Sequence, residues 1–213
     1  MILRRSTPAD LPALQALWQQ VFGDPPAFTG RFYETFGADA AIVAEEDEKV
    51  VAMIHPLPVA LAQNGTYSFG VYIYALATAP DYRGRGIASR LLTEAETAPL
   101  TASTLALEAG LTNRSGNTPA FSLLIPGEES LFAYYRSRGY DRGAQVISHE
   151  AESYPEQLCQ GRGFEPIFLK PEPFYTFSRR IPEPVPPPME RALWKPLAPN
   201  LPKDEPTLSH FMQ

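Results

Sequence analysis

The chain begins with a pattern of apolar positions that is typical of an amphipathic helix. The apolar residues lie three or four positions apart and are Leu11, Leu14, Trp18, Val21 and Phe22. This spacing places them on one face of a helix, which Gly23 is expected to end. We expect a short strand before the helix at residues 2–4, Thr7 as the helix N-cap, and a second helix from Pro26 to Gly37.

The pattern then changes to one that favours β-strands. Three strands are expected, at residues 41–44, 50–61 and 67–78, with a turn at 46–48 and a tight hairpin at Asn64-Gly65. The elements expected after Pro80 are a helix containing Ile87 and Leu91, a strand at 120–125, a helix at 129–138 closed by Gly139, and a strand at 145–149. Helices that alternate with strands after an antiparallel start predict a sheet with helices on its faces.

The last part of the chain differs in composition from the first. Of the 23 prolines, 10 lie in residues 1–154 and 13 in residues 155–213. Because proline fixes φ and cannot donate a backbone hydrogen bond, residues 155–213 are expected to be extended and rich in loops. We predict one domain over 1–213, with a core at 1–149 and an extension at 150–213 that docks on it and supplies a last strand near 192–197.

Charge and cysteine content exclude several classes of protein. The net charge of −6 and the pI near 5.1 argue against a general nucleic-acid binder. The single cysteine, Cys159, rules out an internal disulfide and a cysteine-based structural zinc site. No signal peptide and no apolar run of about 18 residues is present, so we expect a soluble cytoplasmic protein without a membrane partner.

The segment from residue 76 to residue 88 carries the clearest chemistry. A strand leads into a glycine turn and the turn leads into a helix, whose unpaired N–H groups and dipole favour an anion. Gly84 and Gly86 allow close approach to the backbone, and Arg83 and Arg85 add positive charge. The Lys-Ser or Lys-Thr ending of a P-loop is absent, and so is the third glycine of a dinucleotide fingerprint. The pattern favours a site for a pyrophosphate.

Two motifs resemble those of the GNAT superfamily of N-acetyltransferases. Arg83-Gly84-Arg85-Gly86-Ile87-Ala88 fits the acetyl-CoA motif of that family, which is Arg or Gln, two residues, Gly, one residue, then Gly or Ala. Tyr135-Arg136-Ser137-Arg138-Gly139-Tyr140 fits its second signature, a helical tyrosine four residues before a Gly-aromatic pair. The resemblance covers residues 1–149. Residues 124–135 are most similar to the enhanced-intracellular-survival type, although the chain has no room for the further carboxy-terminal domains of that type.

The resemblance implies a fold and a cosubstrate. The fold would be α+β, with a mixed, mostly antiparallel central sheet, helices on both faces and a splayed pair of parallel strands. The strand after the motif helix would lie at 120–125, which leaves 99–118 as an insertion, or alternatively at 103–109. Acetyl-CoA would bind without a metal, and the residues implied to contact it are Leu76, Ala77, Thr78, Arg83, Gly84, Arg85, Gly86, Ile87, Ala88 and Phe132.

The resemblance also implies direct transfer of the acetyl group to an amine. Tyr135 would be the general acid that protonates the departing thiolate, with Tyr134 as the neighbouring alternative. The general base stays open among Glu108, Glu128, Glu129, His55 and Tyr74. The acceptor is an amine of a small molecule, peptide or protein, and a homodimer is left open. A CoA-binding module without turnover is the alternative function.

Overall fold

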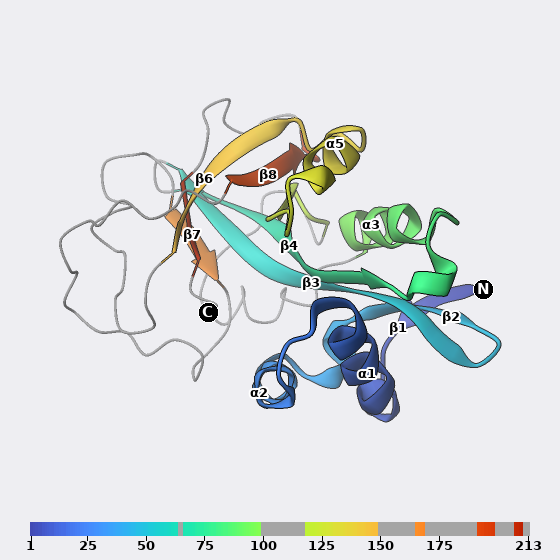
Figure 1. Cartoon of the computed structure of the whole chain (residues 1–213). Helices are drawn as coiled ribbons and strands as arrows, with labels where there is room; N and C mark the ends of the chain where they lie inside the picture. Colours follow the sequence, from blue (N-terminus) through green and yellow to red (C-terminus); the bar gives the residue numbers. More distant parts are fainter. Residues whose placement is uncertain (64–65, 99–117, 149–164, 169–190, 199–206, 211–213) are drawn as a thin grey trace. The chain divides into compact units, whose positions relative to one another are not determined.

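The structure is a computed structural model that describes residues 1–63, 66–98, 118–148, 165–168, 191–198 and 207–210 (Figure 1). The chain divides into two compact units. The first unit comprises residues 1–57 and 72–98, and the second comprises residues 58–71 and 99–213. Two long strands, β3 (Lys49–Gln63) and β4 (Thr66–Thr78), contribute residues to both. The hairpin turn expected at Asn64-Gly65 and the alternative strand at 103–109 lie outside the described residues.

The sheet of the first unit has the strand order β1-β2-β3-β4, where β1 is Ile2–Arg5 and β2 is Ile42–Glu46. Both β1 and β3 are antiparallel to β2, with Leu3 opposite Ala44 and Val43 opposite Met53. Every residue of β3 from Val51 to His55 is buried. A continuous buried run needs both faces of the sheet covered. In this unit α1 and α2 lie on one side of the strands and α3 on the other (Figure 1).

The helices of the first unit begin and end close to the expected positions. They are η1 (Pro8–Asp10), α1 (Leu11–Phe22), α2 (Pro26–Phe36), η2 (Ala38–Ala40), η3 (Pro80–Tyr82) and α3 (Ile87–Thr97). Gly23 ends α1 with a left-handed φ of 76°. The buried face of α1 consists of Leu14, Leu17 and Trp18, whereas Phe22 is 44% exposed. Phe22 is the last helical residue, so its ring reaches only the edge of Trp18, at a centroid distance of 5.9 Å.

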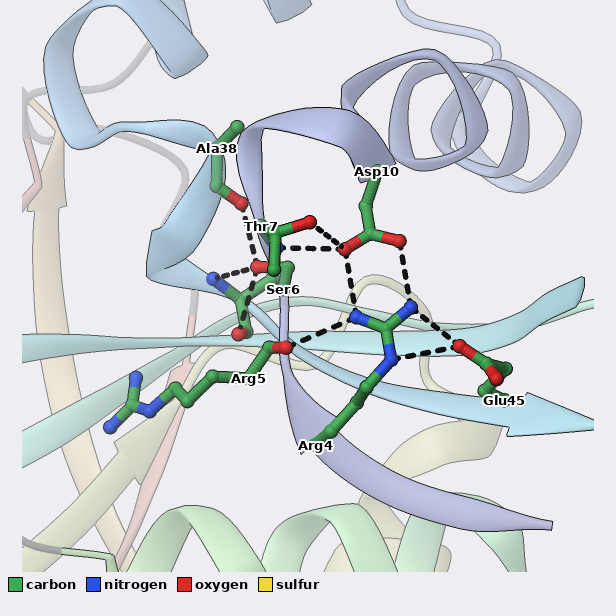
Figure 2. Close-up of polar contacts among 8 residues, drawn as sticks. Arg4, Arg5, Ser6, Thr7, Asp10, Ala38 and Glu45 are labelled. Atoms are coloured by element: carbon green, nitrogen blue, oxygen red, sulfur yellow. Dashed lines mark hydrogen bonds and ion pairs between the residues drawn. The ribbon is translucent and has the colours of Figure 1, made fainter. Parts of the chain in front are cut away.

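A network of charged side chains joins β1, β2 and η1 (Figure 2). The Arg4 guanidinium donates to both carboxylate oxygens of Asp10 at 2.8 Å and to Oε2 of Glu45 at 2.6 Å. Asp10 also accepts a hydrogen bond from the backbone N–H of Thr7, at 2.7 Å, and completes a capping box with that residue. The hydrogen bonds from Arg4 hold the pKa of Asp10 well below its usual range.

The second unit contains β5 (Phe121–Leu124), α5 (Ser130–Arg136), β6 (Arg142–Ser148), β7 (Glu165–Phe168), β8 (Arg191–Pro196) and β9 (Thr207–His210). β8 lies between β5 and β6 and is antiparallel to both, with Trp194 opposite Leu123 on one side and Arg142 on the other. The strand expected near residues 192–197 is therefore present as β8. β9 is parallel to β6, and β7 is antiparallel to the segment 59–62 of β3.

These registers confirm the expected α+β class, with a mostly antiparallel arrangement that includes one parallel pair, β6 and β9. The splay expected beside Leu76–Thr78, and the organisation of 1–213 as one domain, stay predictions. Within the described ranges, no helix is both long and apolar enough to span a bilayer.

Candidate functional site

The glycine turn after β4 has the backbone that an anion site requires. Gly84 and Gly86 have φ values of 76° and 74°, a region that residues with a Cβ rarely adopt. A Cβ built on either glycine would meet no heavy atom within 4 Å, so open space adjoins the loop. Gly86 is the N-cap of α3, and no side chain of the described residues caps that helix end. The first N–H groups of α3 are therefore available to a ligand.

The two arginines of the turn are already engaged in polar contacts. Arg83 Nε donates to the carbonyl oxygen of Thr78 at 3.2 Å. Arg85 Nη2 lies 2.8 Å from Oε1 of Glu46, and its guanidinium carbon is 5.2 Å from the centroid of the Tyr82 ring. The hydrogen bond from Arg85 lowers the pKa of Glu46, which stays ionised. One of the two positive charges that the sequence predicts for the turn is thus matched by a carboxylate.

The strand that leads into the turn has an unusual backbone at Ala75. Its φ of 44° lies in the left-handed region, which is strained for a residue other than glycine. Leu76, Ala77 and Thr78 follow directly and end β4. Ala77 is buried, whereas Leu76 and Thr78 are partly exposed. A local kink of this kind re-aims the backbone groups that follow it, as a β-bulge does.

Tyr135 lies in the second unit, on α5, and is 8% exposed. Its ring packs edge-on against Tyr134 and Tyr140, at centroid distances of 5.2 and 5.9 Å. Tyr140 is fully buried and its hydroxyl is 2.7 Å from Oγ of Ser122 on β5. Burial raises the pKa of Tyr135 to about 12, so the phenol stays protonated at neutral pH.

The other residues of α5 are more exposed. Phe132 is partly exposed, and the guanidinium of Arg138 lies 3.4 Å from the ring centroid of Tyr134. Tyr134 is also partly exposed, so Tyr135 is the more buried phenol of the pair. Because Leu76–Ala88 belongs to the first unit and Phe132 and Tyr135 to the second, the meeting of the two groups stays a prediction.

The candidates for the general base fall into different environments. Glu128 and Glu129 are exposed just before α5, and Glu128 is hydrogen-bonded to Ser130. His55 is fully buried, and burial lowers its pKa to about 3, so it cannot collect a proton from solvent at neutral pH. Glu108 lies outside the described residues. Among the residues that the structure covers, no group of three or more His, Cys, Asp or Glu side chains could hold a metal ion.

Two contributors to this region are not among the residues selected from the sequence. Glu46 lies 39 positions before Arg85, and nothing in the local sequence pairs them. Ala75 is the second, because alanine carries no signal for a left-handed backbone. A glycine at position 75 would have indicated an unusual backbone, whereas the alanine found there does not.

Comparisons with known proteins agree with the motif. A family model described as an acetyltransferase (GNAT) domain matches residues 3–99, just under half of the chain. No curated protein matches the chain.

Several solved structures are similar to this chain. A GCN5-related N-acetyltransferase from Anabaena variabilis is 21% identical, with a TM-score of 0.48, over 68% of this chain and 32% of that one. Eis1 from Mycobacterium abscessus is 14% identical, with a TM-score of 0.48, over 68% of this chain and 33% of that one. A GNAT family acetyltransferase from Brucella melitensis in complex with acetyl-CoA is 18% identical, with a TM-score of 0.41, over 62% of this chain and 80% of that one.

The chain spans about a third of the length of the first two of these structures. The motif at the start of α3 and the strands that precede it lie inside the matched segment. Over residues 3–99 the chain is therefore similar to an acetyltransferase domain of the GNAT type.

Proposed function

We propose that this protein transfers the acetyl group of acetyl-CoA directly to an amine. The observation that carries the proposal is the open glycine turn at the uncapped start of α3, which directly follows the kinked end of β4. The N–H groups of Arg83–Ala88 would hold the pyrophosphate, and the backbone of Leu76–Thr78 would bind the pantetheine arm. These residues fit the ligand, since the space beside Gly84 and Gly86 is open and α3 offers unpaired donors.

The chemistry is aminolysis of a thioester. The lone pair of the acceptor nitrogen attacks the carbonyl carbon, the carbon–sulfur bond breaks, and the acetyl group stays on nitrogen. The departing sulfur takes one proton, and the nitrogen loses one. Tyr135 would supply the first proton, because its burial keeps the phenol protonated at neutral pH. The group that accepts the second proton, the one lost by the acceptor nitrogen, is not assigned. His55 is disfavoured in this role because it is buried.

The binding half of the proposal is tested at Gly86. Gly86→Glu places a side chain and a negative charge in the space that the phosphates would occupy, so acetyl-CoA binding measured by calorimetry should be lost. Gly86→Ala introduces the same backbone strain without the charge and should bind more tightly than the Glu variant. Thr93→Glu adds a charge to an exposed position of α3 and serves as the control. Unchanged binding in Gly86→Glu, with the fold intact by circular dichroism, would contradict the site.

The catalytic half is tested at Tyr135. Tyr135→Phe removes only the hydroxyl, and the loss of general acid catalysis should lower kcat by about 10²–10⁴-fold if chemistry limits turnover. The dissociation constant for acetyl-CoA should change little. Tyr134→Phe, at the preceding position of α5, tests the alternative general acid and should leave kcat unchanged. Wild-type kcat in Tyr135→Phe, where product release is shown not to be limiting, would remove Tyr135 from the mechanism.

The acceptor and the subfamily are further parts of the proposal. We propose an amine of a small molecule, peptide or protein as acceptor, and the enhanced-intracellular-survival type as the nearest branch. A panel of amines, followed by release of free thiol from acetyl-CoA, would identify the acceptor class. Binding of acetyl-CoA without thiol release from any amine would favour a CoA-binding module without turnover.

A further inference from the structure

A pair of buried hydroxyl groups joins β5 to the residue that follows the turn after α5. Ser122 is the polar residue of β5, and both Ser122 and Tyr140 are fully buried. Oγ of Ser122 and the hydroxyl oxygen of Tyr140 are 2.7 Å apart, the usual length of a hydrogen bond between two hydroxyl groups. Since a hydrogen bond has a preferred direction, this pair restricts the ring of Tyr140 more than apolar contacts alone would.

The sheet of the second unit provides a fixed support for Tyr140. Ser122 lies opposite Lys195 in the antiparallel pairing of β5 with β8, and this pairing fixes the backbone of Ser122. Nζ of Lys195 is 5.8 Å from the centroid of the Tyr140 ring, within the range of a cation–π contact. Two neighbouring strands therefore contact Tyr140, one through a hydrogen bond and the other through a cation near the ring.

Tyr140 is in turn tied to Tyr135 through both its backbone and its ring. The N–H of Tyr140 donates to the carbonyl oxygen of Tyr135 at 3.2 Å, across a reversal of the chain in which Gly139 has a φ of 88°. The two rings meet edge-on, with centroids 5.9 Å apart and planes at 69° to one another. A shift of Tyr140 would therefore change the position of both the backbone and the ring of Tyr135.

The helix that carries Tyr135 is short and depends on such contacts. The structure describes every residue of α5, and among them Tyr135 is the one that is buried. A helix of seven residues has about two turns, which are too few to be stable without packing against other elements. The position of α5 is therefore set by tertiary contacts, and those between Tyr135 and Tyr140 are among them.

We infer that Ser122 is a positioning residue for Tyr135. Its hydrogen bond fixes the ring of Tyr140, and the ring and backbone of Tyr140 set the position of the Tyr135 phenol. The catalytic meaning of this hold rests on the proposed function, in which that phenol protonates the departing thiolate. The structural hold itself does not rest on it, and Ser122 needs no contact with acetyl-CoA in this role.

The first test observes the ring of Tyr135 in the free protein. Its NMR signals, in protein labelled at the tyrosine rings, are assigned by their absence in Tyr135→Phe. Ser122→Ala leaves both tyrosine rings chemically intact, so a change in these signals reports a change in placement, and we expect one. Ser137→Ala is the matched control, because it removes an exposed hydroxyl just after α5, one that donates to the carbonyl oxygen of Tyr134 at 2.8 Å.

Signals of Tyr135 that move no more in Ser122→Ala than in Ser137→Ala would overturn the inference. If Ser122→Ala does not fold, the double variant Ser122→Ala with Tyr140→Phe takes its place. Removal of both hydroxyl groups leaves neither buried without the other, so this variant should lose little stability. The signals of Tyr135 must move there too, again by more than in the control.

The second test measures thiol release from saturating acetyl-CoA in a single turnover, with the amine of the panel that is acetylated fastest. Ser122→Ala should lower this rate by about 10–100-fold through misplacement of the phenol, while the dissociation constant of acetyl-CoA changes little. Added to Tyr135→Phe, the same substitution should not lower the rate further, because the phenol is already absent. An unchanged rate in Ser122→Ala, or an equal fall in both backgrounds, would overturn the positioning role.

The two tests separate this inference from the proposed function. If no amine of the panel is acetylated, or if Tyr135→Phe keeps the wild-type rate, the proposed function of Tyr135 fails. The NMR signals of Tyr135 in the free protein still decide whether Ser122 holds that ring in place.

Discussion

Among the glycines of the second unit whose surroundings the structure describes, Gly70 is the one at which an added methyl group should destabilise the fold most. It lies in β4 beside β5, and a Cβ built on it would be 2.5 Å from the carbonyl oxygen of Phe121 and 2.7 Å from two ring carbons of that residue. The ring of Phe121, itself 4% exposed, covers the glycine backbone. Neither the strand carbonyl nor the buried ring can move away without disturbing its neighbours.

Two opposing effects decide how much Gly70→Ala changes the free energy of unfolding. Gly70→Ala restricts the unfolded chain, which stabilises the fold by about 0.4–1 kcal/mol. Forcing an extra carbon into a packed site costs about 1–3 kcal/mol. The overlap at 2.5 Å involves backbone, so we take the upper part of that range, and the net loss is about 1–2 kcal/mol. For a chain of this size the Tm should fall by about 2–8 °C.

The same substitution in α2 provides a control of opposite sign. A Cβ on Gly30 would meet nothing within 4 Å, so Gly30→Ala should gain helix propensity, about 1 kcal/mol, and raise the Tm by about 2–4 °C. Thermal unfolding followed by circular dichroism would measure both. Adding Phe121→Leu to Gly70→Ala should relieve only the ring overlap, so most of the loss should stay. A Gly70→Ala protein that melts at or above the wild-type temperature would refute the reasoning.

Three further predictions concern the first unit. Glu48 has a φ of 60° in the turn before β3, so Glu48→Gly should raise stability by about 1 kcal/mol, seen as a higher Tm. The depressed pKa of Asp10 means that its pairing with Arg4 stabilises the fold above about pH 4 and is lost as the pH falls further; Asp10→Asn should flatten that loss in urea titrations at pH 3 and pH 7. Glu46→Gln should free Arg85, tighten acetyl-CoA binding and steepen the salt dependence of that binding in calorimetry. Unchanged affinity would show that the ion pair with Glu46 does not compete with binding of acetyl-CoA by Arg85.

The helices and strands were predictable because their signals are local. The end of α1 follows from Gly23, whose φ of 76° suits glycine alone, and the periodicity of Leu14 and Trp18 marks the buried face. The same periodicity also selected Phe22, which is exposed, and omitted Leu17, which is buried. The spacing of apolar residues shows which face of the helix is buried. It does not show how far along the helix that face is covered by other elements.

The candidate site, too, was predictable from the sequence only in part. The glycine turn was predictable, since Gly84 and Gly86 occupy a backbone region that glycine favours. The environment of His55 was not, because a histidine that follows an apolar run gives no local sign of whether it faces solvent or, as here, aromatic rings. The left-handed backbone at Ala75 was not predictable either, because alanine carries no signal for it.

The place of β8 between β5 and β6 has a consequence for synthesis of the chain. About 70 residues separate Leu123 from its partner Trp194, so at about 5–20 residues per second a ribosome needs roughly 4–14 s to deliver the central strand after the first of its neighbours. During that interval the edges of β5 and β6 that β8 will cover lack their partner, and exposed strand edges are where chains associate wrongly. Yield in cells should therefore depend on chaperone supply and on translation speed between residues 125 and 191, and a chain cut before Arg191 should aggregate.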